Sequence, residues 1–302
     1  MLIQTSAPAV TLLRRLAPLV LAFTLPAVGM AQSSPATTSS PASPPMNGIA
    51  HIAVRVKDVA TSADFYHKLG FAQPFSMHKG DVITQAFLKI NDRQFIELYP
   101  VTDRDPQAGF LHLCFEGADL NALHDYYVAN GLTPNYVRKA GAGNLLFTMK
   151  GPQQYADPQN IEYTQYMPES MHSKDIGKDL GPDRVGDKMT VVALSMQDPA
   201  AATEYYITKL GFGLSKTHPN RLDLPGDSGE AVEIVPVSEL GSRSSIVLTT
   251  PDLNKSEAQL KRQQVAYKRA DMEFVDAHGK KSRVEMIAVT DPDGNIIRIQ
   301  QQ

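Results

Sequence analysis

Four separated segments in the N-terminal half each place one metal-binding residue type inside an apolar, strand-like run. The four residues are His51, Glu97, His112 and Glu162. A titratable side chain in such a run is costly unless it is paired or coordinates a metal ion. Two imidazoles and two carboxylates form a mixed nitrogen and oxygen set that suits a divalent metal, with positions left for water or substrate. We therefore predict a divalent metal site built from these four residues.

Each candidate ligand lies on a predicted strand within a repeated unit of one strand, one helix and three strands. In the first unit, the strand that holds His51 precedes a helix that Asp58 can cap and that Gly70 ends, and the last strand holds Glu97. The second unit repeats this order, with His112 in its first strand. The remaining strands of these two units are predicted at residues 71–77, 84–90, 135–138, 145–149 and 161–166.

The second half of the chain contains the same unit twice. Residues 68–71 and 209–212 both read Lys-Leu-Gly-Phe at the end of a predicted helix. Residues 231–236 likewise resemble residues 95–100. Such similarity indicates an internal repeat. Pairing two units lets their sheets close into a cup with the helices outside.

The predicted fold class is therefore α+β, with two domains that each pair two βαβββ modules in a curved, cup-like sheet. The predicted segments are a signal peptide (1–31), a disordered Ser/Pro-rich tether (32–46), an N-terminal domain with the metal site (47–167), a polar linker (168–188) and a degenerate C-terminal domain (189–302). We expect cleavage after Ala31 and a periplasmic or secreted protein. A retained N-terminal anchor is the alternative, although the apolar run is short and broken by prolines.

Composition excludes some classes of partner. The 302 residues carry a formal net charge of −3, and removing residues 1–31 would take away only Arg14 and Arg15, leaving −5. The basic residues are scattered, so a nucleic-acid partner is not expected. With a single cysteine, no internal disulfide can form. A small-molecule substrate is the expected partner, no stable membrane span is expected after signal removal, and a homodimer stays open.

The repeated unit, the Phe-Tyr-x-x-Leu-Gly-Phe helix end at residues 65–71 and the positions of the four candidate ligands resemble the vicinal oxygen chelate superfamily. This superfamily includes glyoxalase I, extradiol dioxygenases and bleomycin-resistance proteins. The resemblance covers residues 48–301 and implies ligands from the first and last strands of paired units. Glyoxalase I resembles the pattern most, because it has a carboxylate at both last-strand positions.

The resemblance extends to an alignment of the two halves. Val191, Glu233, Ser245 and Arg298 fall where His51, Glu97, His112 and Glu162 lie in the first half. We predict that Arg298 neutralises Glu233 and that the C-terminal cup is metal-free and scaffolds or covers the substrate. The turn before Glu162 is two residues shorter than the turn at Asp291, and a one-residue slip would turn Glu162 to the other face of the sheet.

Other titratable residues have simpler interpretations. Cys114 shares a strand face with His112 and is predicted to be a buried, inert thiol. Arg55 shares a face with His51, where it would meet an anionic substrate or form a surface ion pair. Four further histidines are interpreted as surface residues: His67, His78, His124 and His172.

The resemblance implies a glyoxalase-like enzyme, a metal-dependent lyase or isomerase that stabilises an enediolate from a substrate with vicinal oxygens. Glu97 or Glu162 would be the catalytic base, and the metal would be nickel, zinc, manganese or iron. Two alternatives remain: a non-haem iron extradiol-type dioxygenase that uses His51, His112 and Glu162, and a small-molecule binding protein without turnover. Glyoxalase I depends on a cytosolic thiol cofactor, so an exported chain is predicted to have a different substrate.

Overall fold

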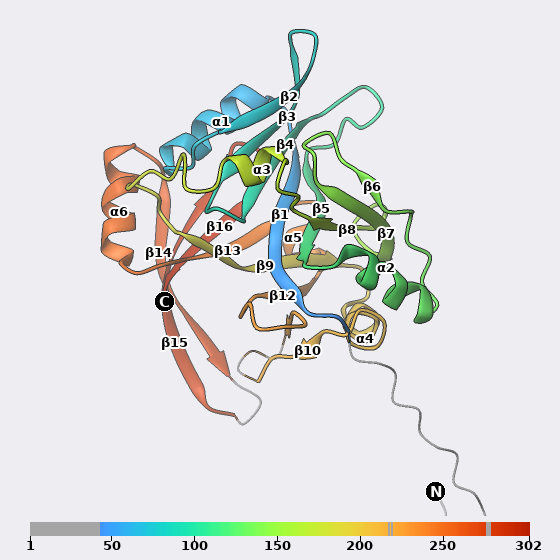
Figure 1. The fold of residues 1–302 in the computed structure, drawn as a ribbon. Helices are drawn as coiled ribbons and strands as arrows, with labels where there is room; N and C mark the ends of the chain where they lie inside the picture. Colours follow the sequence, from blue (N-terminus) through green and yellow to red (C-terminus); the bar gives the residue numbers. More distant parts are fainter. Residues whose placement is uncertain (1–42, 217, 219, 276–278) are drawn as a thin grey trace, which may run out of the picture. The chain divides into compact units, whose positions relative to one another are not determined.

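The computed structural model describes residues 43–216, 218, 220–275 and 279–302. The predicted signal peptide and most of the predicted tether lie outside these residues. The described chain contains two eight-stranded mixed sheets with the same internal strand order (Figure 1). Within the described residues, no helix is both long enough and apolar enough to span a membrane.

The N-terminal sheet has the strand order β2-β3-β4-β1-β5-β8-β7-β6. Its strands are β1 (Met46–Val56), β2 (Phe75–Lys79), β3 (Val82–Lys89), β4 (Phe95–Pro100), β5 (Gly109–Gly117), β6 (Arg138–Lys139), β7 (Leu145–Gln153) and β8 (Pro158–Gln165). Strand β1 pairs in parallel with β4 and antiparallel with β5, and β5 pairs in parallel with β8. The four strands that hold the candidate ligands are therefore adjacent, at the centre of this sheet.

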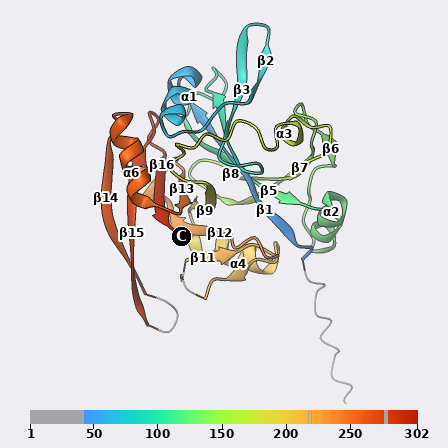
Figure 2. The ribbon, with the colours of Figure 1, turned by 60° about the vertical axis from the view of Figure 1, so that its left-hand side comes forward.

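The C-terminal sheet repeats this topology with the order β10-β11-β12-β9-β13-β16-β15-β14. Its strands are β9 (Lys188–Met196), β10 (Gly213–Leu214), β11 (Arg221–Asp223), β12 (Ala231–Pro236), β13 (Ser245–Thr250), β14 (Tyr267–Val275), β15 (Lys281–Thr290) and β16 (Ile296–Gln301). Figure 2 shows the long β14–β15 hairpin beside helix α6. The predicted α+β fold of paired βαβββ modules is confirmed.

Four of the helices follow the first strand of a module, and an aspartate caps each of them. The helices are α1 (Val59–Lys68), α2 (Leu120–Ala129), α3 (Met171–Lys174), α4 (Pro199–Thr208), α5 (Val237–Leu240) and α6 (Leu253–Arg262). The carboxylates of Asp58, Asp119, Asp198 and Asp252 accept backbone N–H bonds in the first turns of α1, α2, α4 and α6. Such caps satisfy backbone donors that have no partner inside the helix.

The two sheets share one hydrophobic core, to which Ile52, Tyr66, Tyr206 and Leu248 belong. Polar contacts also join the halves close to the first candidate ligand. The backbone N–H of Ile49 donates to Oε2 of Glu230 at 2.5 Å, and the side-chain amide of Gln94 bonds both the N–H and the carbonyl of Met189. The C-terminal half therefore holds β1 in place two residues before His51.

The structure corrects two local strand predictions and shows a short helix in the predicted linker. The strand expected at 71–77 begins only at Phe75, after Pro74, which has no backbone N–H to donate. The strand expected at 135–138 is reduced to the two residues of β6. The segment 168–188, predicted as a polar linker, contains α3 and packs against the N-terminal sheet, where buried Lys89 Nζ lies 2.7 Å from Asp175 Oδ2. An ion pair between distant residues leaves no signal in the local composition.

Candidate metal centre

Strand register brings the four predicted ligands to one face of the N-terminal sheet. Ala53, two residues after His51 on β1, pairs with Glu97 on one side and with His112 on the other. Cys114, on β5, pairs with His51 on β1 and with Glu162 on β8. Because side chains alternate along a strand and paired residues share a face, all of these side chains point the same way. The shorter turn before Glu162 therefore does not shift its register.

The side chains converge on His51. Its Nε2 atom lies 3.1 Å from His112 Nε2 and 3.4 Å from Glu162 Oε1, and its Nδ1 atom lies 3.2 Å from Glu97 Oε1. The residues fall into two groups that share His51, one with Glu97 and His112 and one with Cys114 and Glu162, each within 4.8 Å. His51, Glu97 and His112 are 3–5% exposed. The structure thus brings all four predicted site residues together.

Two residues that the sequence did not assign to the site hold Glu97 in position. Gln85 Nε2 and the Tyr99 hydroxyl donate to Glu97 Oε2 at 2.6 and 3.1 Å. The other carboxylate oxygen, Oε1, remains directed at His51. Tyr99 follows Glu97 by two residues, so the alternation of a strand could have placed it beside the site. Gln85 comes from β3, and nothing in the local sequence indicates its role.

Burial and charge set the protonation of the site. Burial lowers the pKa of His112 to about 4, so this imidazole is neutral at pH 7. Burial acts to raise the pKa of Glu162, but the imidazoles of His112 and His51 outweigh it and lower that pKa to about 2. Burial raises the pKa of Glu97 against the opposing effect of His51. Burial acts to lower the pKa of His51, but Glu97 and Glu162 outweigh it and raise that pKa. Metal ions bind neutral imidazoles and ionised carboxylates, so a bound ion would displace any proton held by His51 or Glu97.

The residues fit a divalent metal ion. His51 Nδ1 is buried and makes no hydrogen bond, although Glu97 Oε1 is near. Two imidazole Nε2 atoms that face each other at 3.1 Å need a shared proton or a cation between their lone pairs. With one ring nitrogen from each histidine, the two imidazoles and the two carboxylates form a donor set for a first-row divalent metal.

The interpretation of His172 as a surface residue is wrong. The residue is 2% exposed, its ring stacks on Tyr166 with centroids 4.8 Å apart, and three phenylalanines meet it edge-on. Its Nδ1 lies 3.0 Å from Asn144 Nδ2, while its Nε2 is buried without a hydrogen bond. Burial lowers its pKa to about 3. Helix α3 thus inserts a neutral imidazole beside Phe95, two residues before Glu97.

Cys114 is fully buried next to Glu162, as predicted. Burial and the neighbouring Glu162 charge raise the pKa of its thiol well above the usual range. A thiol in this state is protonated and unreactive. Of the other histidines interpreted as surface residues, His67 and His78 are exposed, and His124 is half-buried against Phe147.

The C-terminal sheet has the four matching positions, but only Glu233 among them is a metal-binding residue type. Ala193 pairs with Glu233 and with Ser245, as Ala53 pairs with Glu97 and with His112 in the first half. Val247 pairs with Arg298, as Cys114 pairs with Glu162. The predicted alignment of the two halves is therefore confirmed. Arg298 Nη2 donates to Glu233 Oε2 at 2.5 Å, so the one remaining carboxylate is neutralised as expected.

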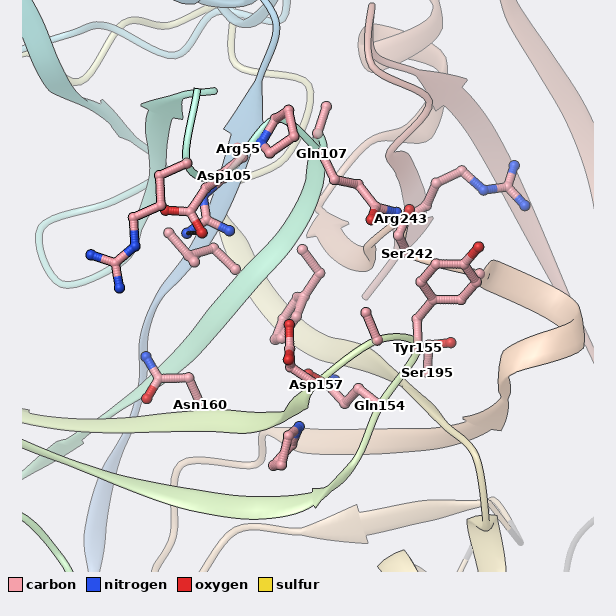
Figure 3. A pocket seen from close by; sticks show the side chains of 18 of the residues that line it. Arg55, Asp105, Gln107, Gln154, Tyr155, Asp157, Asn160, Ser195, Ser242 and Arg243 are labelled. Atoms are coloured by element: carbon pink, nitrogen blue, oxygen red, sulfur yellow. Dashed lines mark ion pairs between the residues drawn. The ribbon is translucent and has the colours of Figure 1, made fainter. Parts of the chain in front are cut away.

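A cavity of about 740 Å³ adjoins the candidate centre and is lined by residues of both halves (Figure 3). Arg55 reaches it from β1, on the face that holds His51, and forms an ion pair with Asp105 at 3.4 Å. Asn160 reaches it from β8, two residues before Glu162. Ser242 and Arg243 line it from the C-terminal half. Arg55 and Asn160 thus connect the lining of the cavity to the strands that carry His51 and Glu162, and none of the four candidate ligands lines the cavity itself.

Comparisons with known proteins agree with this architecture. Residues 48–162 match the model of the Glyoxalase/Bleomycin resistance protein/Dioxygenase superfamily. A comparison with curated proteins gives no significant match.

Several solved structures share the fold. An Mn(II)-bound glyoxalase from Novosphingobium aromaticivorans is 13% identical, with 85% of this chain and 82% of that chain covered and a TM-score of 0.63. The 2,3-dioxygenase LapB from Pseudomonas sp. KL28 is 15% identical, with coverage of 86% and 94% and a TM-score of 0.63. Homoprotocatechuate 2,3-dioxygenase from Brevibacterium fuscum is 17% identical, with coverage of 87% and 83% and a TM-score of 0.58. Residues 48–162 therefore match the glyoxalase, bleomycin resistance and dioxygenase superfamily, which corresponds to the vicinal oxygen chelate superfamily that the sequence resembles, and the described chain shares its fold with these solved structures.

Proposed function

We propose that the protein is a divalent-metal-dependent lyase or isomerase, related to glyoxalases, that acts on a small substrate with two neighbouring oxygens. The proposal is carried by one observation: Glu97 Oε1 lies in the same buried group as the imidazoles of His51 and His112, with Glu162 on the other side of His51. These four residues would hold the metal ion. A bound divalent ion would supply Lewis-acid polarisation of the substrate oxygens.

The two carboxylates are suited to different tasks. Burial raises the pKa of Glu97, whereas the pKa of Glu162 lies near 2. A base works best when its pKa lies close to the operating pH. Glu97 would therefore take the proton from the carbon beside the substrate carbonyl and return it to the neighbouring atom, while Glu162 stays ionised. Gln85 and Tyr99 would hold the carboxylate of Glu97 in place through its Oε2 atom.

A ring-cleaving dioxygenase is the second candidate. In that case His51, His112 and Glu162 would hold iron, and Glu97 would remain as a carboxylate in the pocket. The fold shared with two dioxygenases over most of their length supports this reading. The proximity of Glu97 to His51 and the two hydrogen bonds that Glu97 accepts favour the lyase or isomerase, because a four-residue donor set gives both carboxylates a role.

Export is part of the proposal. Residues 14–31 contain two arginines, an apolar stretch and a small-residue site after Ala31, as a signal peptide does. A periplasmic or secreted enzyme would work without a cytosolic thiol cofactor. The substrate is therefore proposed to differ from that of glyoxalase I.

Elemental analysis of the purified mature chain, followed by assays with a panel of 2-oxoaldehydes and catechols, tests the proposal. We expect about one nickel, zinc or manganese ion per chain, as a single mononuclear site requires, and turnover of an oxoaldehyde-type substrate. Bound iron together with catechol ring cleavage would favour the dioxygenase. A chain that binds no metal at stoichiometric level would contradict both enzymes and leave a binding protein.

A further inference from the structure

The cavity beside the candidate centre carries an excess of positive charge. Four cationic residues line it, namely Arg55, Arg104, Lys150 and Arg243, against two carboxylates, Asp105 and Asp157. The lining is therefore net positive by two charges, although the whole chain has a formal net charge of −3. We propose that this cavity selects substrates that carry an oxyanion, a carboxylate or a phosphate, at the end opposite the vicinal oxygens. This inference rests on the proposed metal centre and names its substrate class.

The cations lie at a distance that a small molecule can bridge. Asn160 lines the cavity and lies two residues before Glu162 on β8. Because Leu113 of β5 pairs with Ile161 of β8, the preceding residues, His112 and Asn160, lie beside each other on these two strands. Two residues of a strand span roughly 6.6 Å. A molecule bound at the centre would pass Asn160 and place its far end among the cations. Phe110 and Leu111 line the same space and would contact an apolar middle part.

Most of the positive charge is not neutralised by the protein. The side chains of Arg104 and Lys150 form no hydrogen bond or ion pair with any described residue. Among the described residues, Arg243 donates to the backbone carbonyls of Leu240 and Glu239 and to no carboxylate. Arg55 has a half-exposed partner, Asp105, at 3.4 Å. Cationic groups without a carboxylate partner in the lining of one cavity attract an anion from solvent.

The C-terminal half completes the cavity. The backbone N–H of Phe110 donates to the carbonyl of Ser242 at 2.8 Å, and a Cβ atom at Gly109 would lie 2.3 Å from the same oxygen. This close approach fixes the segment that carries Arg243 against β5. In Figure 3, Arg55 and Arg243 lie on opposite sides of the cavity. The sheet without ligands would thus contribute to substrate selection.

Hydroxamates test the inference without knowledge of the reaction, because they chelate divalent metals through two neighbouring oxygens. The probes are adipic acid monohydroxamate, its uncharged terminal amide and a phosphonate-tailed analogue, titrated calorimetrically into the zinc-loaded mature chain. An oxyanion that gains charge-assisted hydrogen bonds should bind about tenfold tighter than the amide. The preference should decrease with added salt. The tighter of the two anionic probes identifies the preferred oxyanion.

A triple variant, Arg104→Gln, Lys150→Gln and Arg243→Gln, should lose this preference while its metal content and its affinity for the amide stay unchanged. A matched triple variant of exposed cations outside the cavity, Lys68→Gln, Lys79→Gln and Arg138→Gln, should keep it. Equal binding of acid and amide to the wild-type chain, or a preference that survives in the first variant, would overturn the oxyanion pocket alone. Failure of all probes and of zinc to bind the wild-type chain would instead contradict the metal centre.

Discussion

Arg298 is hydrogen-bonded to Glu233 at the two positions of the C-terminal sheet that Glu162 and Glu97 occupy in the N-terminal sheet. One half therefore has two carboxylates near an imidazole pair, and the other has a carboxylate and a guanidinium. The two carboxylates near the imidazole pair have no guanidinium beside them among the described residues, whereas Glu233 of the C-terminal sheet has Arg298. The same backbone register thus produces a candidate metal centre in one half and a closed ion pair in the other.

Replacing one imidazole should remove the metal. We expect His112→Ala to lower metal affinity by more than about 100-fold, since changes in groups that only support a ligand already cost 10–100-fold. Glu233→Gln, at the matching position of the C-terminal sheet, should leave metal content unaltered. Metal per chain after gel filtration in chelator-treated buffer is the measurement. Stoichiometric metal in the His112 variant would refute the ligand assignment.

Breaking the ion pair in the C-terminal sheet should cost stability but no metal. Arg298→Met leaves Glu233 largely buried, with Arg221 3.9 Å away as its remaining cation. The free energy of unfolding should fall by about 3 kcal/mol, as when one partner of a buried pair is removed. The double variant with Glu233→Leu should recover most of this loss in urea denaturation. A single variant as stable as the wild type would show that the pair is dispensable.

The Tyr99 hydroxyl should affect metal affinity through its hydrogen bond to Glu97. Tyr99→Phe keeps the ring but removes a 3.1 Å hydrogen bond to Glu97 Oε2. We expect metal affinity to fall by about tenfold, the lower range for a group that orients a ligand. Tyr136→Phe is a control, because Tyr136 is 75% exposed. Competition with a fluorescent chelator measures the metal affinity of each variant. A Tyr99 variant that binds metal as tightly as the Tyr136 variant would exclude an orienting role for Tyr99.

His172 should make the metal-free protein sensitive to acid. Its pKa is lowered to about 3 by burial, against 6.5 for an ordinary imidazole. As the pH falls below 6.5, the unfolded chain binds a proton that the folded chain does not, so the free energy of unfolding decreases. Between pH 6.5 and 4 this loss amounts to at most about 3 kcal/mol.

The variant His172→Phe lacks this titration and keeps an aromatic ring among the neighbouring phenylalanines. Its unfolding free energy, measured in urea with chelator present, should decrease less than that of the wild type over the same pH range. His78→Gln, at an exposed histidine, should follow the wild type. Parallel curves for the wild type and the His172 variant would contradict the effect.

The features that could be predicted from the sequence depend on the alternation of side chains along a strand and on the internal repeat. Alternation along a strand placed Cys114 on the face of His112, and the internal repeat aligned Arg298 with Glu162. The features that were missed depend on partners far away in the chain. Lys89 is buried because Asp175 reaches it from 86 residues further along the chain. His172 is buried because aromatic residues of three other strands surround it.

The bond from Ile49 to Glu230 bears on attempts to simplify this protein. A gene shortened to its first half would encode every candidate ligand but would lack the acceptor that steadies the strand of the first imidazole, and also the wall that carries Arg243. Such a shortened chain should fail to bind metal because β1 would not be held in place, although it would contain all four candidate ligands. The C-terminal half is thus bonded to the strand of the candidate centre, although the described residues of its own sheet form no candidate ligand set.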